Sequence, residues 1–491
     1  MRIAARLALA TISGALFAAA FAPLGWSYLV FFGAFAFVAA VWRASLPIAL
    51  VAGALGGAVF YALLLSWMSV VGTDAWIGVT AFLTVWFIAG AIGTAVVSTL
   101  PGAPFWVAAV WIAIEALRDR IPFGGFPWGR FGFATVGTGV DWSASIVGVA
   151  GLTGIVVLLA SCAVWVIEQR SRGRVIACAA VVGSCIAVAV GGYLMTPASS
   201  GSTRIAVVQG SVPEYGMGAM DTRRQVLNNH LKQTLKLANT ERVDGVIWPE
   251  NASDIDPLAD ASTASALTSA ARAVDAPILV GAVIIDPKDP KYRLNVGIVW
   301  TKDGPGQLYA KTHPVPFGEY IPFRAQLAGY TDRFDRIPMD FAAGERPGNL
   351  EFAGVNLGDV ICFEIAYTDV VRDVVTNGAQ LISVQTNNAT YGATGQPAQQ
   401  LAITRLAAIE HGRWVAVAAT SGVSAFIDPH GTVVQQLTDN TAGFLLQDVP
   451  LSTGLTIADR ISPYAEWLVT ILAFGAVGYG LFARRSLRHL G

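Results

Sequence analysis

Three side chains of complementary chemistry stand at the ends of short apolar runs. They are Glu250, Lys311 and Cys362. In α/β folds the ends of strands are where functional sites collect. Acyl transfer through a thioester needs a thiolate nucleophile, a carboxylate to take its proton and a cation to stabilise the oxyanion. The three residues supply one of each, so we predict that they form a catalytic set with Cys362 as the nucleophile.

Taken one at a time, the three residues have ordinary structural explanations. An unpaired cysteine is commonly a small buried hydrophobe. A carboxylate that follows a strand is commonly solvated, and the stem of a lysine covers apolar surface. Cys362 is the only one of the four cysteines outside the predicted membrane segments, so it has no evident disulfide partner. It is the set of three that favours catalysis.

The elements that must position these residues follow from the pattern between Gly201 and Pro450. Short β-branched runs alternate there with polar helical stretches, which is typical of an α/β domain. The polar stretch 196–203 before it is predicted to be a linker. Strands are predicted at 204–209, 244–248, 277–285, 294–300, 307–311, 359–363, 381–385, 414–419 and 424–427, and helices at 219–239, 256–273, 366–376 and 396–411.

The composition of the 491 residues indicates a membrane protein with a water-soluble part. The chain is 54% hydrophobic and 13% charged, whereas a soluble globular protein carries about 25% charged residues. A membrane-spanning helix needs about 20 apolar residues. About eight stretches are candidates, of which the fifth is short and runs into charged residues: 5–23, 25–42, 47–71, 75–99, 103–117, 143–167, 175–195 and 464–483.

We therefore predict three parts of the chain. A transmembrane domain with about seven spans occupies 1–200, a catalytic domain occupies 201–460, and a C-terminal transmembrane helix with a short tail occupies 461–491.

Arginine residues indicate which ends of the spans lie in the cytoplasm. They fall near the N-terminus, at Arg43, at 170–174 and at 484–488. With an even number of crossings, this pattern puts both termini inside and the catalytic domain outside. A cleaved signal peptide is an alternative interpretation of the first apolar stretch, and it would change the number of crossings.

Sequence strings around the three residues resemble the nitrilase superfamily. They are WPEN at 248–251, YAKTHPVPFGEYIPF at 309–323 and GDVICFEIAY at 358–367. The ordered set Glu250, Lys311 and Cys362 is similar to the Glu-Lys-Cys triad of that superfamily. The resemblance implies an αββα sandwich for the catalytic domain.

Soluble nitrilases lack membrane spans on both sides of this domain, and the whole architecture resembles the apolipoprotein N-acyltransferase family. The resemblance includes the segments 115–118, 125–128 and 421–431. It implies an enzyme of the bacterial plasma membrane that moves an acyl chain from a phospholipid onto Cys362. The acyl chain would then be transferred to the α-amine of a diacylglyceryl-modified N-terminal cysteine of an apolipoprotein. Glu250 would act as the general base, and Lys311 would stabilise the oxyanion.

The same resemblance implies supporting residues. Glu319 and Glu364 match positions that orient the triad, and Phe363 stands next to the nucleophile. Their ordinary interpretation is as loop and turn residues. Contacts with substrate or lipid are expected from Trp128, Asn387 and Tyr391. For Trp128, anchoring of an amphipathic ring at the membrane interface is the alternative.

Five positions depart from the pattern of the family. They are Phe363 for a tyrosine, Pro314 for a leucine, Asn388 for an aspartate, Thr390 for a tryptophan, and Gly218 where an aromatic residue often stands. None of them removes a member of the triad. They bear on donor and acceptor preference, so we do not carry those preferences over from the family.

Two other functions fit parts of the sequence. A membrane-tethered amidase would use the same triad and hand the acyl group to water, but it would not need so many spans. A transporter or scaffold would need ionisable residues within its spans, and the spans here are almost bare of them.

The net charge of −1 gives no indication of nucleic acid. The histidines are scattered and do not have the spacing of zinc ligands. The chemistry requires no cofactor, and nothing demands more than a monomer.

Overall fold

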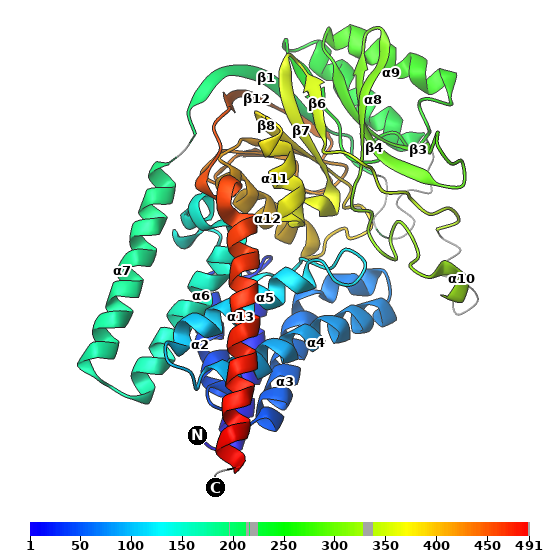
Figure 1. Ribbon diagram of the computed structural model, residues 1–491. Coiled ribbons are helices and arrows are strands. Elements are labelled where there is room, and N and C mark those ends of the chain that lie inside the picture. Colours follow the sequence, from blue (N-terminus) through cyan, green and yellow to red (C-terminus); the bar gives the residue numbers. More distant parts are fainter. Residues whose placement is uncertain (196, 213–215, 217–223, 328–336, 490–491) are drawn as a thin grey trace. The chain divides into compact units, whose positions relative to one another are not determined.

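The computed structural model describes residues 1–195, 197–212, 216, 224–327 and 337–489 (Figure 1). Gly218 and the first five positions of the helix predicted at 219–239 lie outside these residues. The chain divides into two compact units. The first comprises Met1–Thr196 together with Thr456–Gly491, and the second comprises Pro197–Leu455.

The first unit is helical, and each of the eight predicted apolar stretches contains most of one helix. Six of these helices are long and apolar enough to cross a membrane. The other two, α2 and α5, have 13 and 16 residues, and at 1.5 Å per residue they are shorter than the apolar layer of a bilayer. The helices are α1 (Ile3–Ala20), α2 (Leu29–Val41), α3 (Leu46–Leu64), α4 (Thr73–Val97), α5 (Ala103–Arg118), α6 (Ala144–Glu168), α7 (Arg172–Leu194) and α13 (Ile457–His489).

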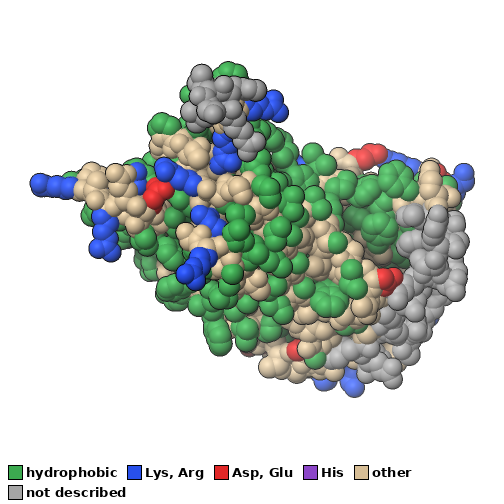
Figure 2. Space-filling model, turned by 90° about the horizontal axis from the view of Figure 1, so that it is seen from below, with side chains coloured by type: hydrophobic (Ala, Val, Ile, Leu, Met, Phe, Trp, Pro, Cys, Tyr) green, Lys and Arg blue, Asp and Glu red, His purple; other side chains and the backbone are tan. Residues whose placement is uncertain are grey.

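Large apolar side chains are exposed along the outer helices of this unit. Ile186 on α7 and Ile471 on α13 are 59% and 65% exposed. Figure 2 shows one face of the molecule, on which hydrophobic side chains predominate and Lys and Arg occur in a few groups. Exposed apolar surface of this extent is not typical of a protein surrounded by water. It is what helices in contact with lipid present.

Charged residues at the end of α5 and after it form an ionic cluster that holds α13, and all of them except Arg120 are buried. Arg130 Nη1 lies 2.9 Å from Asp119 Oδ2, and its Nη2 lies 3.2 Å from Glu466 Oε1. The same carboxylate binds Arg120 at 2.8 Å, and Arg130 Nε lies 3.4 Å from Glu115 Oε2. Glu466 is on α13, so the cluster joins the C-terminal helix to the end of α5.

The second unit contains two six-stranded sheets with the same arrangement of parallel and antiparallel neighbours. The first sheet has the order β12-β1-β2-β3-β4-β5 and the second β11-β10-β9-β8-β7-β6. The strands are β1 (Ser199–Gln209), β2 (Gly245–Ile247), β3 (Ile278–Ile285), β4 (Arg293–Thr301), β5 (Gly304–Ala310), β6 (Asn349–Phe352), β7 (Val355–Ile361), β8 (Leu381–Thr386), β9 (Val415–Ala419), β10 (Ala425–Ile427), β11 (Val433–Gln436) and β12 (Gly443–Ser452).

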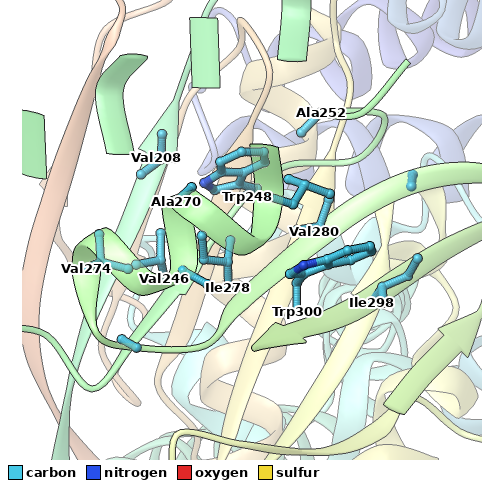
Figure 3. Packing of buried hydrophobic residues seen from close by; sticks show 14 of the residues in the cluster. Val208, Val246, Trp248, Ala252, Ala270, Val274, Ile278, Val280, Ile298 and Trp300 are labelled. Carbon is cyan, nitrogen blue, oxygen red and sulfur yellow. The ribbon is translucent and has the colours of Figure 1, made fainter. Parts of the chain in front are cut away.

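Alternating side chains along the strands build the layers. In β1, Ile205 and Val207 pack against residues of the second sheet, such as Leu357. Ala206 and Val208 point the other way and pack under helices. Figure 3 shows the cluster of buried side chains on this helix-covered side of the first sheet, which includes Trp248 and Trp300. The helices of the unit are α8 (Gln225–Ala238), α9 (Ala261–Val274), α10 (Arg324–Leu327), α11 (Thr368–Thr376) and α12 (Gln396–His411).

The predicted α/β sandwich is confirmed, with corrections at its edges. The strands β6, β11 and β12 were not predicted from the sequence, and each of them is the outermost strand of its sheet. The predicted linker 196–203 is partly wrong, because residues from Ser199 onward belong to β1 and Ser202 pairs with Pro450 of β12. The predicted strand 359–363 ends at Ile361, where a short 3₁₀ turn begins.

Candidate active site

The three predicted catalytic residues follow strands whose carboxyl ends share one edge of the sandwich. Lys311 directly follows β5, which runs in the same direction as β2 because β2 and β3 are parallel and the pairs β3–β4 and β4–β5 are antiparallel. Glu250 follows β2 in the same sheet, and Cys362 directly follows β7 in the other sheet. The fold therefore brings together residues that are far apart in the sequence.

Cys362 is held in an unusual backbone conformation. Its φ is 56°, in the left-handed region that L residues other than glycine rarely adopt. It also starts the 3₁₀ turn Cys362–Ala366. Such a conformation costs about 1–3 kcal/mol and persists only where the surroundings enforce it. The sharp turn places the thiol of this partly exposed residue at the end of the strand.

The Lys311 ammonium lies between two buried or largely buried carboxylates. Its Nζ is 3.5 Å from Glu250 Oε1 and 2.9 Å from Glu319 Oε2. Asn295 Nδ2 donates to the Oε1 atoms of both glutamates, at 2.7 and 2.8 Å. The second oxygen of Glu250 accepts the backbone N–H of Asn387 at 2.9 Å. One cation and two amide donors thus fix the position of the Glu250 carboxylate.

The pKa values of the set are shifted away from their ordinary ranges. Burial raises the pKa of Cys362 to about 12, and the charge of Glu250 adds to this, while Lys311 opposes it. Burial also raises the pKa of Glu250, against the lowering effect of Lys311. For Lys311, burial lowers the pKa, but Glu319 and Glu250 outweigh it and the net shift is upward. The resting site therefore holds a thiol, a strengthened carboxylate base and a stable ammonium.

Glu364 connects the nucleophile turn to the segment that carries Lys311. Its side chain is completely buried. It accepts the backbone N–H of Ile361 at 2.8 Å, that of Thr312 at 2.7 Å, and the hydroxyl of Tyr309 at 2.9 Å. The residue before Cys362 and the residue after Lys311 are therefore bound to one carboxylate.

Three neutral residues of the site were not predicted from the sequence. Asn295 lies in β4 and bridges the two glutamates. Thr386 ends β8 with its hydroxyl 3.4 Å from Cys362 Sγ, and Gln400 of α12 donates to the Cys362 carbonyl at 3.1 Å. A polar residue within or directly after an apolar strand could have indicated a site residue. This signal is weak when the residue carries no charge.

The predicted substrate contacts Asn387, Tyr391 and Trp128 and the predicted supporting residue Phe363 have different surroundings. The backbone of Asn387 touches the triad. Tyr391 is partly exposed, and burial together with the charge of Cys362 raises its pKa. Phe363 is largely buried, and its ring lies 5.7 Å from that of Tyr367. Trp128, in the other unit, is buried with its ring 5.7 Å from that of Trp67, so contact of this side chain with lipid stays a prediction.

Comparison with known proteins covers both units. The family described as apolipoprotein N-acyltransferase N-terminal domain matches residues 13–163, and the carbon-nitrogen hydrolase family matches residues 204–457. The apolipoprotein N-acyltransferase of Mycolicibacterium smegmatis is 34% identical over 95% of this chain and 84% of its own. That of Coxiella burnetii is 28% identical over 93% of this chain and 96% of its own. The solved structure of an amidase from Nesterenkonia sp. AN1 is 18% identical, with a TM-score of 0.40 over 52% of this chain and 92% of that one.

Proposed function

Since the chain belongs to the apolipoprotein N-acyltransferase family, we propose that it moves an acyl chain from a membrane phospholipid, through a thioester on Cys362, to apolipoproteins. The acceptor is the α-amine of the diacylglyceryl-modified N-terminal cysteine. The observation that carries the proposal is the convergence of Cys362, Glu250 and Lys311 at one edge of the sandwich of a multi-pass membrane protein.

The first step forms the acyl-enzyme. The Cys362 sulfur attacks the ester carbonyl of the phospholipid while the thiol proton moves to the Glu250 carboxylate. Lys311 donates to the carbonyl oxygen as negative charge develops on it. When the C–O bond breaks, the glycerol oxygen takes the proton from Glu250, and the lysophospholipid leaves.

The second step transfers the acyl chain to the amine. The α-amine attacks the thioester carbonyl and gives a proton to Glu250. The C–S bond breaks, and the Cys362 thiolate takes that proton back, so both groups return to their starting states. The raised pKa of Glu250 supports this role, because a carboxylate in its usual range is a weak base for a thiol or an amine.

The neighbours of the triad support the same assignment. Glu319 shares the charge of Lys311, which leaves Glu250 able to accept a proton. Glu364 fixes the distance between the nucleophile turn and the Lys311 segment. Asn387 and Tyr391 are proposed to contact the acyl chain or the headgroup beside the thiol, and Phe363 to support the nucleophile turn. Trp128 is proposed to contact lipid from the membrane unit.

We further propose that the protein lies in the bacterial plasma membrane as a monomer, with both termini in the cytoplasm. The catalytic domain is then extracytoplasmic, where diacylglyceryl-modified proteins present their N-terminal cysteine. The arginines at 170–174 and 484–488, at the inner ends of α7 and α13, support this orientation.

The test is a transfer assay with the full-length protein in phospholipid vesicles. A diacylglyceryl lipopeptide is added, and its mass is followed for wild type and for Cys362→Ala. The proposal predicts that the peptide gains one acyl chain on its α-amine with wild type only. Release of free fatty acid without acylated peptide would instead indicate a tethered hydrolase.

A further inference from the structure

The Thr386 hydroxyl has two acceptors within reach and one proton to give. The residue ends β8 and is 2% exposed. Its Oγ1 lies 3.4 Å from Cys362 Sγ and 3.1 Å from Gln400 Oε1, both at donor geometry. A hydroxyl carries a single proton, so it can donate to the sulfur or to the amide oxygen, but not fully to both.

Gln400 does not depend on that proton. Its Oε1 also accepts Asn388 Nδ2 at 2.7 Å and Gln396 Nε2 at 3.4 Å. Its Nε2 donates to the Cys362 carbonyl at 3.1 Å, which fixes the amide with its oxygen toward Thr386. Because the other donors remain, the hydroxyl can turn away from Gln400 without leaving a buried acceptor unsatisfied.

The charges around the sulfur make a neutral donor useful. Lys311 favours a thiolate at Cys362, and the carboxylate of Glu250 opposes it. Among the described residues, the titratable groups Glu319, Glu364 and Tyr391 also face the set. Lys311 is already shared between Glu250 and Glu319. A hydroxyl that turns toward the sulfur stabilises the anion without adding a charge that would weaken Glu250 as a base.

We propose that Thr386 is a further catalytic residue, which donates to Gln400 while Cys362 is a thiol and turns to donate to the sulfur whenever the thiolate forms. The thiolate forms as the thiol attacks the donor ester and again as it leaves the second tetrahedral intermediate. The thiol proton still moves to Glu250, and Thr386 keeps its own proton throughout. This inference rests on the thioester chemistry proposed above for Cys362.

The test compares Thr386→Val, which keeps the shape but lacks the hydroxyl, with Thr386→Ser, which keeps the hydroxyl. Alkylation of Cys362 by iodoacetamide is measured against pH on the full-length protein, with the modified cysteine identified by peptide mass. The rate of acyl-enzyme formation with phospholipid is measured at one pH. Thr386→Ala is a second variant without the hydroxyl, should the valine variant not fold.

The expected result is a rise of about 1 in the pKa of the thiol for Thr386→Val and acylation about tenfold slower, the size of one hydrogen bond to a charged group. Thr386→Ser should restore both. An unchanged alkylation profile in the variants without the hydroxyl would overturn the inference, as would a defect that serine does not restore. The alkylation profile requires no acyl transfer, so failure of wild type to form an acyl-enzyme would count against the proposed function and not against Thr386.

Discussion

The Lys311 ammonium lies 2.9 Å from the Glu319 carboxylate, closer than the 3.5 Å that separates it from Glu250. The cation is therefore closer to a residue that takes no proton in the proposed reaction. Glu250, the proposed base, is only partly neutralised by Lys311 and keeps a raised pKa.

Replacement of Glu319 by Gln should weaken the base. The negative charge of Glu319 helps to raise the pKa of Glu250, so its removal lets Lys311 stabilise the Glu250 carboxylate alone. The pKa of Glu250 then falls, and the acid limb of the acylation rate against pH moves to lower pH. The rate at its maximum should fall about 10- to 100-fold, within the range that general bases contribute. An acid limb at the wild-type position would contradict this assignment.

Replacement of Glu364 by Gln should damage both stability and catalysis. The amide replaces an acceptor oxygen by a donor, so buried N–H groups of Ile361 and Thr312 compete for fewer acceptors. Loss of such a partner costs about 1–3 kcal/mol. The melting temperature should fall, and acylation should slow at least 100-fold because Cys362 and Lys311 are no longer fixed together. Glu351→Gln, at an exposed carboxylate, is the matched control and should resemble wild type in both measurements.

Asp359 should make the protein less stable as the pH rises. The residue is fully buried, its Oδ1 accepts the hydroxyl of Ser383, and burial raises its pKa to about 8. Among the described residues its Oδ2 has no hydrogen-bond partner, and neither has Gln385 Oε1. Both oxygens face the space beside Gly297, because a Cβ atom placed on this glycine would lie 2.1 Å from Asp359 Oδ2 and 2.6 Å from Gln385 Oε1. A protonated Asp359 can donate to Gln385, whereas an ionised one cannot.

The sign follows from the raised pKa. The stabilisation by protonated Asp359 is complete below its unfolded value of 3.8 and is lost as the pH rises toward about 8, with a slope of at most about 1.4 kcal/mol per pH unit. Asp359→Asn keeps a donor for Gln385 and does not titrate. In thermal unfolding from pH 5 to pH 9, the stability of the variant relative to wild type should therefore increase as the pH rises. Parallel curves would show that Asp359 is not protonated in the folded protein.

The ionic cluster of the membrane unit predicts a different kind of defect. Glu466 of α13 binds both Arg120 and Arg130, so Glu466→Gln leaves the buried Arg130 and the partly exposed Arg120 with less compensating charge. Breaking a buried pair in this way costs about 3–5 kcal/mol. The melting temperature of the full-length protein in detergent should fall clearly. Arg460→Gln, at an exposed position on the same helix, should leave it unchanged, and an equal effect of the two variants would contradict a specific role of the cluster.

The elements that were predicted from the sequence are those with a strong local pattern of apolar residues. The helices of the membrane unit were located because lipid requires nearly continuous apolar runs. The strands that carry Glu250, Lys311 and Cys362 were located because they are buried and β-branched. The strands β6, β11 and β12 were missed because an edge strand is half exposed and tolerates polar residues and proline, as at Pro450 in β12.

The neutral part of the site was missed for a related reason. Asn295, Thr386 and Gln400 act through hydrogen bonds whose partners come from distant elements. Thr386 lies in a stretch that resembles the family, but no role was predicted for it, and nothing in the local sequence distinguishes Asn295 and Gln400 from other polar residues. Glu319 and Glu364 were predicted because they match positions of the family that orient the triad, whereas no role was predicted for these amides and this hydroxyl.

The most direct test of the account is the intact mass of the full-length protein after incubation with phospholipid. Wild type should gain the mass of one acyl chain, Cys362→Ala should not, and hydroxylamine should remove the adduct because it is a thioester. Addition of a diacylglyceryl lipopeptide should discharge the adduct onto the peptide amine. Transfer to the peptide by Cys362→Ala, or an adduct on another residue of wild type, would contradict the proposal that Cys362 carries the acyl chain.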